Sequence, residues 1–243
     1  MNIIVFDNLP STNTYLKEHY REYPDFTAIQ AIHQTEGRGR LGRVFIDDSK
    51  QILLSILLKE SISPNHMNLV TLFTAQVVHE FLSEYLDNVL IKWPNDLLVN
   101  GKKICGILTE SIYSEKFEAY IIGIGININS TDFPEPIRDI ATSLKLETHQ
   151  TYEIEMLVNN LTSRFEQSYP VFLKNPVLTT SYQNLHSALV NHSVSYQYEG
   201  KIIEGTVIEI AENGTLHVFS NQKDYYLNSG EIMLIKTKAS IER

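Results

Sequence analysis

The chain has 243 residues, 43% of them hydrophobic and 20% charged, and this length allows one large core and a small second domain. No apolar stretch approaches the ~20 residues of a membrane span, the start lacks the pattern of a secretory signal, and the single cysteine, Cys105, excludes an internal disulfide; we therefore expect a cytoplasmic protein without membrane association. The net charge of −9 argues against broad affinity for nucleic acid.

The N-terminal part of the chain is predicted to alternate strands and helices. Strands are expected at residues 2–6, 28–34 and 51–58. The last of these is a continuous apolar run, which is typical of a strand buried on both faces. Ser11 or Thr12 offers an N-cap for a first helix. A longer helix is expected from Pro64 to about Leu86, because apolar residues recur there every three or four positions.

The rest of the chain is predicted to contain hairpins, two helices and a small all-β region. Strands are expected at residues 89–92, 97–99, 104–113 and 117–128, and helices at 152–173 and 179–185. Asn100-Gly101 is a strong signal for a two-residue hairpin turn. From about His192, short alternating segments are separated by turns, as in small β-barrels. We therefore expect an α+β fold, with a mixed or antiparallel sheet and packed helices over residues 1–188 and an SH3-like β domain over residues 189–243.

A glycine- and arginine-rich segment, Gly-Arg-Gly-Arg-Leu-Gly-Arg at residues 37–43, is the clearest candidate for ligand binding. It fits the dinucleotide-binding pattern G-x-G-x-x-G and nearly fits the P-loop pattern, but both require a helix to begin at the last glycine. The β-prone Val44-Phe45-Ile46 follows instead, and Arg43 stands where the P-loop has lysine. What remains is a loop whose guanidinium groups suit carboxylate or phosphate, the alternative being a basic turn in solvent.

Five motifs in order resemble those of the biotin protein ligases over nearly the whole chain. They are Ser11-Thr12-Asn13, Gln34 with the loop at residues 37–43, Lys92-Trp93-Pro94-Asn95-Asp96, the segment Lys103 to Leu108, and Gly123-Ile124-Gly125-Ile126-Asn127. The resemblance implies a class II synthetase-like catalytic domain followed by the SH3-like domain, in the form without an N-terminal helix-turn-helix. It also implies that the protein activates biotin with ATP and transfers biotin to a lysine of a biotin carboxyl carrier domain of acetyl-CoA or pyruvate carboxylase.

Activation must bring the carboxylate of biotin to the α-phosphate of ATP, and fixed positive charge lowers the repulsion between these two anions. By resemblance, Arg38 and Arg40 contact the carboxylate and the α-phosphate, Arg43 contacts the outer phosphates, and Lys103 holds the carboxylate. Arg38, Arg40 and Lys103 are thus the expected catalytic residues.

The two substrates are expected to meet different side chains. The ureido ring of biotin needs hydrogen-bond partners when it is buried, and the residues expected around biotin, besides Arg38, Arg40 and Lys103, are Ser11, Thr12, Asn13, Gln34, Gly37, Gly39 and Gly106. Ser11 and Thr12 also suit helix capping. For ATP, besides Arg40 and Arg43, the expected residues are Phe45, Asn95, Asp96 and Asn127. Asp96 is the expected ligand of Mg²⁺, and no tightly bound prosthetic group is expected.

Phe45 departs from the pattern of the biotin protein ligases. Many family members have tryptophan at this position, where it covers adenine, so we expect weaker stacking. Trp93 and Cys105 are interpreted as apolar core residues. The family also suggests a homodimer. The alternatives are a lipoate or octanoate ligase and a non-catalytic biotin-binding regulator; direct DNA binding is not expected.

Overall fold

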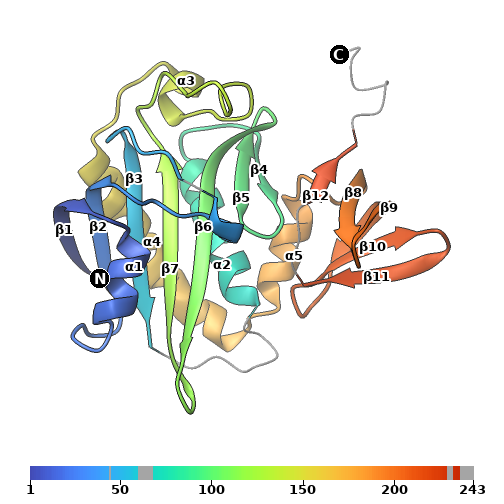
Figure 1. Cartoon of the computed structure of the whole chain (residues 1–243), viewed down its shortest axis with the longest axis horizontal. Helices are drawn as coiled ribbons and strands as arrows, with labels where there is room; N and C mark the ends of the chain where they lie inside the picture. Colours follow the sequence, from blue (N-terminus) through green and yellow to red (C-terminus); the bar gives the residue numbers. More distant parts are fainter. Residues whose placement is uncertain (44, 60–67, 229–231, 236–243) are drawn as a thin grey trace.

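A seven-stranded mixed sheet organises the larger part of the molecule (Figure 1). The computed structural model describes residues 1–43, 45–59, 68–228 and 232–235. The strand order is β1-β2-β3-β7-β6-β5-β4, with β1 and β2 parallel and all other pairs antiparallel. The strands are β1 (Asn2–Leu9), β2 (Thr27–Gln34), β3 (Gln51–Leu58), β4 (Val89–Lys92), β5 (Asp96–Val99), β6 (Lys102–Tyr113) and β7 (Phe117–Asn127).

Helices cover the two faces of this sheet unequally. The helices α2 (Leu69–Leu82) and α4 (Ile154–Lys174) pack behind it and enclose the main core with the apolar side chains of β3 and β7 (Figure 1). On the front face, α1 (Thr12–His19) covers only the part near β2, β3 and β7, where a smaller cluster around Leu16 is buried. The uncovered remainder of the front face is therefore accessible to a ligand.

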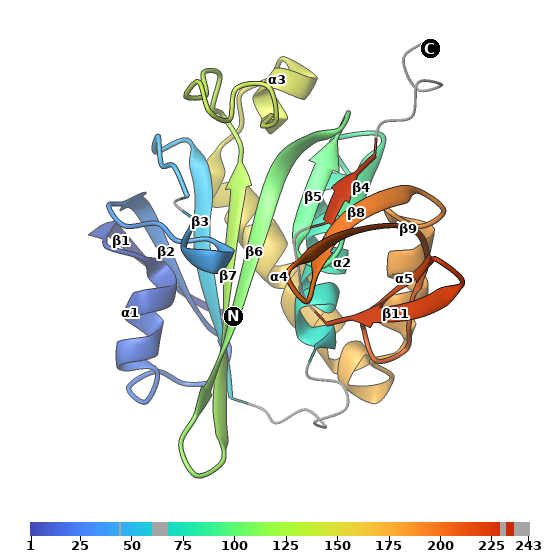
Figure 2. The same cartoon turned by 45° about the vertical axis from the view of Figure 1, so that its right-hand side comes forward.

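A second, five-stranded sheet is entirely antiparallel and has the order β11-β10-β9-β8-β12. Its strands are β8 (Ser193–Tyr198), β9 (Lys201–Ile210), β10 (Leu216–Ser220), β11 (Lys223–Leu227) and β12 (Ile232–Leu234). Figure 2 shows it beside the end of the main sheet that carries β4, with α5 (Leu178–Leu185) leading into it.

Two polar contacts join the second sheet to the rest of the chain. The Asn184 side chain on α5 exchanges two hydrogen bonds with the backbone of Ile210, at 2.9 and 2.7 Å. The buried indole of Trp93 donates to the carbonyl of Gly214 at 3.0 Å. Gly214 has a φ of +82°, which favours glycine, and a Cβ there would come within 2.9 Å of Leu69 Cδ2 on α2.

The predicted elements agree with this structure, with differences at their ends. Strand 51–58 is confirmed, and Asn100-Gly101 forms the expected turn with both φ angles positive. The start expected for the long helix, at Pro64, lies outside the described residues. The short helix α3 (Leu144–Thr148) was not predicted; Ser143 caps it, since its hydroxyl accepts from the amide of Leu146. No described helix is long and apolar enough to cross a membrane.

Candidate functional site

A cavity of about 740 Å³ opens on the uncovered front face of the main sheet. The segment that carries the short 3₁₀ turn at residues 40–42 crosses in front of β7 and β6 and forms one wall (Figure 1). All residues predicted for the site line this cavity except Gly37: they are Ser11, Thr12, Asn13, Gln34, Arg38, Gly39, Arg40, Arg43, Phe45, Asn95, Asp96, Lys103, Gly106 and Asn127. Residues from distant parts of the sequence are thus gathered in one place.

The glycine- and arginine-rich loop adopts neither the dinucleotide-binding geometry nor the P-loop geometry, as predicted from the sequence. The 3₁₀ turn Arg40–Gly42 ends at Gly42, whose φ of +74° favours glycine, and no α-helix begins there. The amide of Gly39 donates to the carbonyl of Arg43 at 2.7 Å and closes the turn. Gly37 is buried outside the cavity lining, and its carbonyl accepts from the amide of Phe45 at 2.9 Å. Gly37 therefore shapes the loop.

Positive charge gathers around one carboxylate in the middle of the cavity. Lys103 Nζ lies 2.6 Å from Asp96 Oδ1, and Arg40 Nη1 donates to Asn95 Oδ1 at 2.8 Å. The Asn95 amide nitrogen donates to Asp96 at 3.1 Å and to the carbonyl of Ile107 at 3.0 Å, which fixes its orientation. Burial lowers the pKa values of Arg40 and Lys92 from their ordinary values, since water no longer stabilises their charge fully. An anionic ligand would restore that stabilisation.

At the other end of the cavity, polar side chains at the start of α1 are buried, and Gln34 at the end of β2 is half-buried. The Ser11 hydroxyl accepts from the amide of Thr14 and caps α1, so the capping role expected for it is confirmed. Gln34 Oε1 accepts from the backbone amide of Thr12 at 2.6 Å. Asn13 donates from its side-chain amide to the carbonyl of Leu108 at 3.2 Å and to Glu110 at 2.9 Å. This end therefore presents fixed hydrogen-bonding groups.

Glycines leave the floor of the cavity flat. Gly106 on β6 pairs directly with Gly125 on β7. A Cβ at Gly125 would come within 2.7 Å of the Phe45 ring, one at Gly106 within 3.0 Å of Lys103 Nζ, and one at Gly123 within 2.4 Å of Asn13 Oδ1. Each glycine thus makes room for a predicted site residue, which gives a physical reason for the G-x-G spacing.

If Phe45 stacks on adenine, as the family resemblance implies, Gly125→Ala is expected to displace the Phe45 ring and weaken the binding of ATP by about tenfold, because a stacking contact contributes roughly 1–1.5 kcal/mol. The affinity for biotin should change little. Binding titrations with ATP and with biotin measure both dissociation constants. Ile202→Ala, which truncates an exposed side chain on β9 outside the cavity lining, serves as the control. An unchanged ATP constant in Gly125→Ala would contradict the role given to Phe45.

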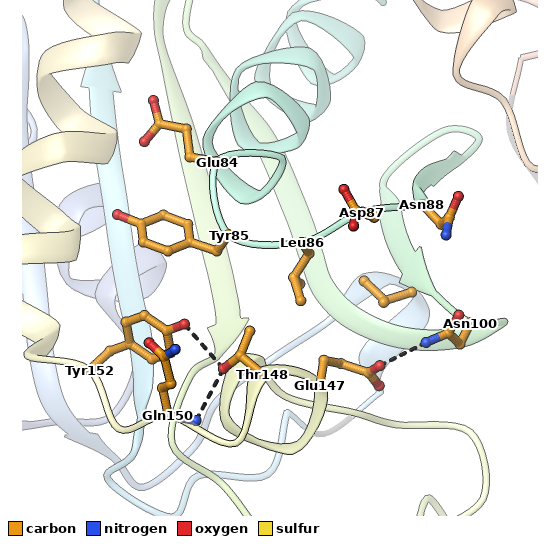
Figure 3. Close-up of a pocket in the computed structure, with 11 residues that line it drawn as sticks. Glu84, Tyr85, Leu86, Asp87, Asn88, Asn100, Glu147, Thr148, Gln150 and Tyr152 are labelled. Atoms are coloured by element: carbon orange, nitrogen blue, oxygen red, sulfur yellow. Dashed lines mark hydrogen bonds between the residues drawn. The ribbon is translucent and has the colours of Figure 1, made fainter.

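A second hollow, of about 600 Å³, lies where α2 ends, near the turn at Asn100 (Figure 3). Two of its acidic side chains are engaged by their neighbours: Glu147 accepts from Asn100 at 2.8 Å, and Glu84 pairs with Arg164. None of the predicted site residues lines it. The cavity on the front face is therefore the candidate active site.

Several lining or supporting residues were not predicted. Ser55 is fully buried on β3 and contacts both Thr12 and Asn13. Gln51 donates to Asn127 at 3.3 Å, and Met233 of the second sheet lines the cavity although it lies near the other end of the chain from the glycine- and arginine-rich loop. The signal for Ser55 in the sequence is that it is the one polar residue in the interior of the apolar run at residues 51–58. Within the described part of the chain, no group of three or more His, Cys, Asp or Glu side chains is arranged to hold a metal ion.

Comparison with known proteins agrees with the geometry of this cavity. The sequence model of the biotin/lipoate A/B protein ligase family matches residues 5–127. The bifunctional ligase/repressor BirA of Bacillus subtilis is 36% identical over 174 residues, which cover 69% of this chain and 54% of that protein. The biotin–[acetyl-CoA-carboxylase] ligase of Mycobacterium tuberculosis is 32% identical over 126 residues, 49% of this chain and 45% of that protein. The chain thus spans about half the length of these relatives.

Solved structures extend the similarity to nearly the whole chain. The biotin protein ligase from Aquifex aeolicus in complex with biotin and ATP superposes with a TM-score of 0.85 and 28% identity, covering 97% of this chain and 99% of that one. The resemblance inferred from the five motifs is therefore confirmed. Because the family's sequence model spans half of the chain and includes all five motifs, this chain belongs to the biotin/lipoate A/B protein ligase family.

Proposed function

We propose that the protein activates biotin with ATP to biotinyl-5′-AMP and transfers the biotin to a lysine of a carrier protein. The observation that carries this proposal is the cavity in which hydrogen-bonding groups at one end meet Arg38, Arg40, Arg43 and Lys103 at the other. The relative solved with biotin and ATP shares the fold over this whole region.

In the first step, a carboxylate oxygen of biotin attacks the α-phosphorus of ATP and pyrophosphate leaves. The arginines and Lys103 offset the repulsion between the two anions. Asn95 holds the Arg40 guanidinium in place, and burial removes competing water from it. Lys103 Nζ lies 3.0 Å from the position that a Cβ would take at Gly106, so the ammonium group reaches the floor of the cavity where the carboxylate would rest.

The remaining predicted residues divide between the substrates. Ser11, Thr12, Asn13 and Gln34 form the end for the ureido ring, with Gly39 and Gly106 leaving room for the biotin chain. Phe45 and Asn127 border the nucleotide, where Phe45 stacks on adenine. Asp96 fits a magnesium ion because Mg²⁺ often binds one protein carboxylate together with substrate phosphates. The ion would neutralise phosphate charge there.

In the second step, the lysine amine of the carrier attacks the carbonyl of the mixed anhydride, and AMP leaves. Holding the two groups in the right geometry can supply about 7–11 kcal/mol of the barrier in such a transfer. We place the acceptor, a biotin carboxyl carrier domain, at the open side of the cavity, where Met233 of β12 adds an exposed side chain. The proposal includes a catalytic domain at residues 1–188 and an SH3-like domain at residues 189–243; the fully antiparallel pairing of β8 to β12 supports it.

The cellular setting is also part of the proposal. We expect a cytoplasmic enzyme that forms homodimers and has no direct contact with DNA, given its net charge of −9. A lipoate or octanoate ligase of the same family is disfavoured by the polar end of the cavity. A dithiolane ring or an alkyl chain offers no N–H or carbonyl group to Thr12 and Gln34, and burying these groups unpaired costs about 1–3 kcal/mol each.

The test is to incubate the purified chain with MgATP, a carrier domain, and biotin, lipoate or octanoate separately, and to measure the intact mass of the carrier. We expect an increase of one biotinyl group, which disappears without ATP or when the acceptor lysine is replaced. A mass increase of one lipoyl or octanoyl group, without any biotinyl increase, would indicate a lipoate or octanoate ligase instead. Binding of biotin without any mass increase on several carriers would favour a regulator.

A further inference from the structure

A fully buried serine links two residues at the polar end of the cavity. Ser55, on β3, has its Oγ 2.6 Å from Thr12 Oγ1 and 2.6 Å from Asn13 Oδ1. Its cross-strand partner is Gly123, whose missing side chain leaves the space that Asn13 fills. Thr12 lines the cavity and is 3% exposed.

The neighbours of Ser55 determine where its single proton lies. The Asn13 amide nitrogen faces two acceptors, the carbonyl of Leu108 and the carboxylate of Glu110, so Asn13 Oδ1 must be the atom toward Ser55. That oxygen cannot donate, and a contact of 2.6 Å between two oxygens needs a proton. The Ser55 hydroxyl therefore donates to Asn13.

The same reasoning fixes the hydroxyl of Thr12. With the Ser55 proton committed to Asn13, the 2.6 Å contact between Ser55 and Thr12 requires that Thr12 donate to Ser55. The other neighbour of the Thr12 hydroxyl, Gln34 Oε1, lies farther away at 3.1 Å and already accepts from the Thr12 amide at 2.6 Å. Thr12 Oγ1 is left with lone pairs alone for a ligand in the cavity.

We propose that Ser55 is a positioning residue that makes Thr12 an obligatory hydrogen-bond acceptor and thereby selects ligands with an N–H at this point. A ureido N–H is a donor of the required kind. The inference rests on the proposed function and adds a selection mechanism to it.

The test compares biotin with its two cyclic carbamate analogues, in which one or the other ureido N–H is replaced by oxygen. In the native enzyme, kcat/KM for adenylation should fall by about tenfold or more for the analogue that faces Thr12 with oxygen. In Ser55→Ala, the Thr12 hydroxyl loses its acceptor at 2.6 Å and keeps only the longer contact to Gln34 Oε1 at 3.1 Å, so it can turn its proton to the ligand. The ratio of kcat/KM for biotin to that for this analogue should then narrow to about threefold or less. The KM for ATP should stay unchanged.

Three further variants separate positioning from a structural effect. Ser55→Thr keeps the hydroxyl and should keep the native ratio. In a Thr12→Val background, removing the Ser55 hydroxyl should no longer alter the ratio, since its effect passes through Thr12. Ser220→Ala, which removes a buried hydroxyl from β10, should behave as the native protein.

The outcomes are distinguishable from those of the proposed function. If the native protein attaches biotin to its carrier but Ser55→Ala keeps the full carbamate discrimination, the role of Ser55 is wrong and the ligase function stands. The role of Ser55 is equally wrong if its effect persists in the Thr12→Val background. If the native protein does not adenylate biotin at all, the proposed function itself fails.

Discussion

Replacing Arg40 with alanine is expected to slow adenylate formation by about 100- to 1,000-fold, the effect of removing a preorganised charge from a developing anionic transition state. Arg40 is half-buried, and its guanidinium is fixed by Asn95 at 2.8 Å. Its contribution therefore requires no reorganisation when the two anions meet. Biotin-dependent exchange of pyrophosphate into ATP measures this step without the carrier.

The control is Arg21→Ala, which removes an exposed arginine paired with Glu118 on the surface and should leave the exchange rate unchanged. Arg40→Lys should recover only part of the activity, because an ammonium cannot reproduce the paired donors of a guanidinium. Near-native exchange in Arg40→Ala would refute the catalytic role of this arginine.

Lys103→Gln is expected to reduce adenylation by about 10- to 100-fold, with most of the loss in the apparent affinity for biotin. Lys103 Nζ lies 3.0 Å from the position that a Cβ would take at Gly106 on the floor of the cavity, and Asp96 at 2.6 Å holds it there. Glutamine keeps much of the length and removes the charge. The measurement is the biotin dependence of single-turnover adenylate formation at saturating ATP.

Lys102 offers a matched control for this variant. It is the adjacent residue on β6, is exposed, and does not line the cavity. Lys102→Gln changes the net charge of the protein by the same amount and should leave the rate unaltered. Equal losses in the two variants would show that overall charge, and not the position of Lys103, governs the reaction.

The sequence predicted those elements whose formation depends on local pattern. The strand at residues 51–58 was identified with its bounds because both of its faces are buried and the apolar run is unbroken except at Ser55. Cys105 was interpreted as a small apolar residue, and the structure agrees, since burial raises the pKa of its thiol and keeps it protonated. The five-residue helix α3 escaped prediction because it is too short to show a helical period.

Site residues within a local motif were likewise predicted from the sequence, and those that depend on distant partners were not. Short motifs identified 14 of the residues that line the cavity, because each motif lies within a single turn or strand, whereas the lining residues between Asp132 and Ala141 belong to none of the motifs. Ser55 and Met233 were missed because their roles depend on partners far away in the chain. Trp93 was expected to be a core residue, and it is 3% exposed; but its bond to Gly214 depends on how the second sheet sits against α2, which no local pattern encodes.

That bond has a consequence for the interpretation of inactive variants of this protein. A missense change at Gly214 must accommodate a φ of +82° and a contact with Leu69, so the turn would move and the indole of Trp93 would lose its acceptor. Two residues after that indole stands Asn95, which holds Arg40. Gly214 does not line the front-face cavity, so a ranking of variants by that lining would score it as harmless. We nevertheless expect such a variant to resemble one with a displaced Arg40.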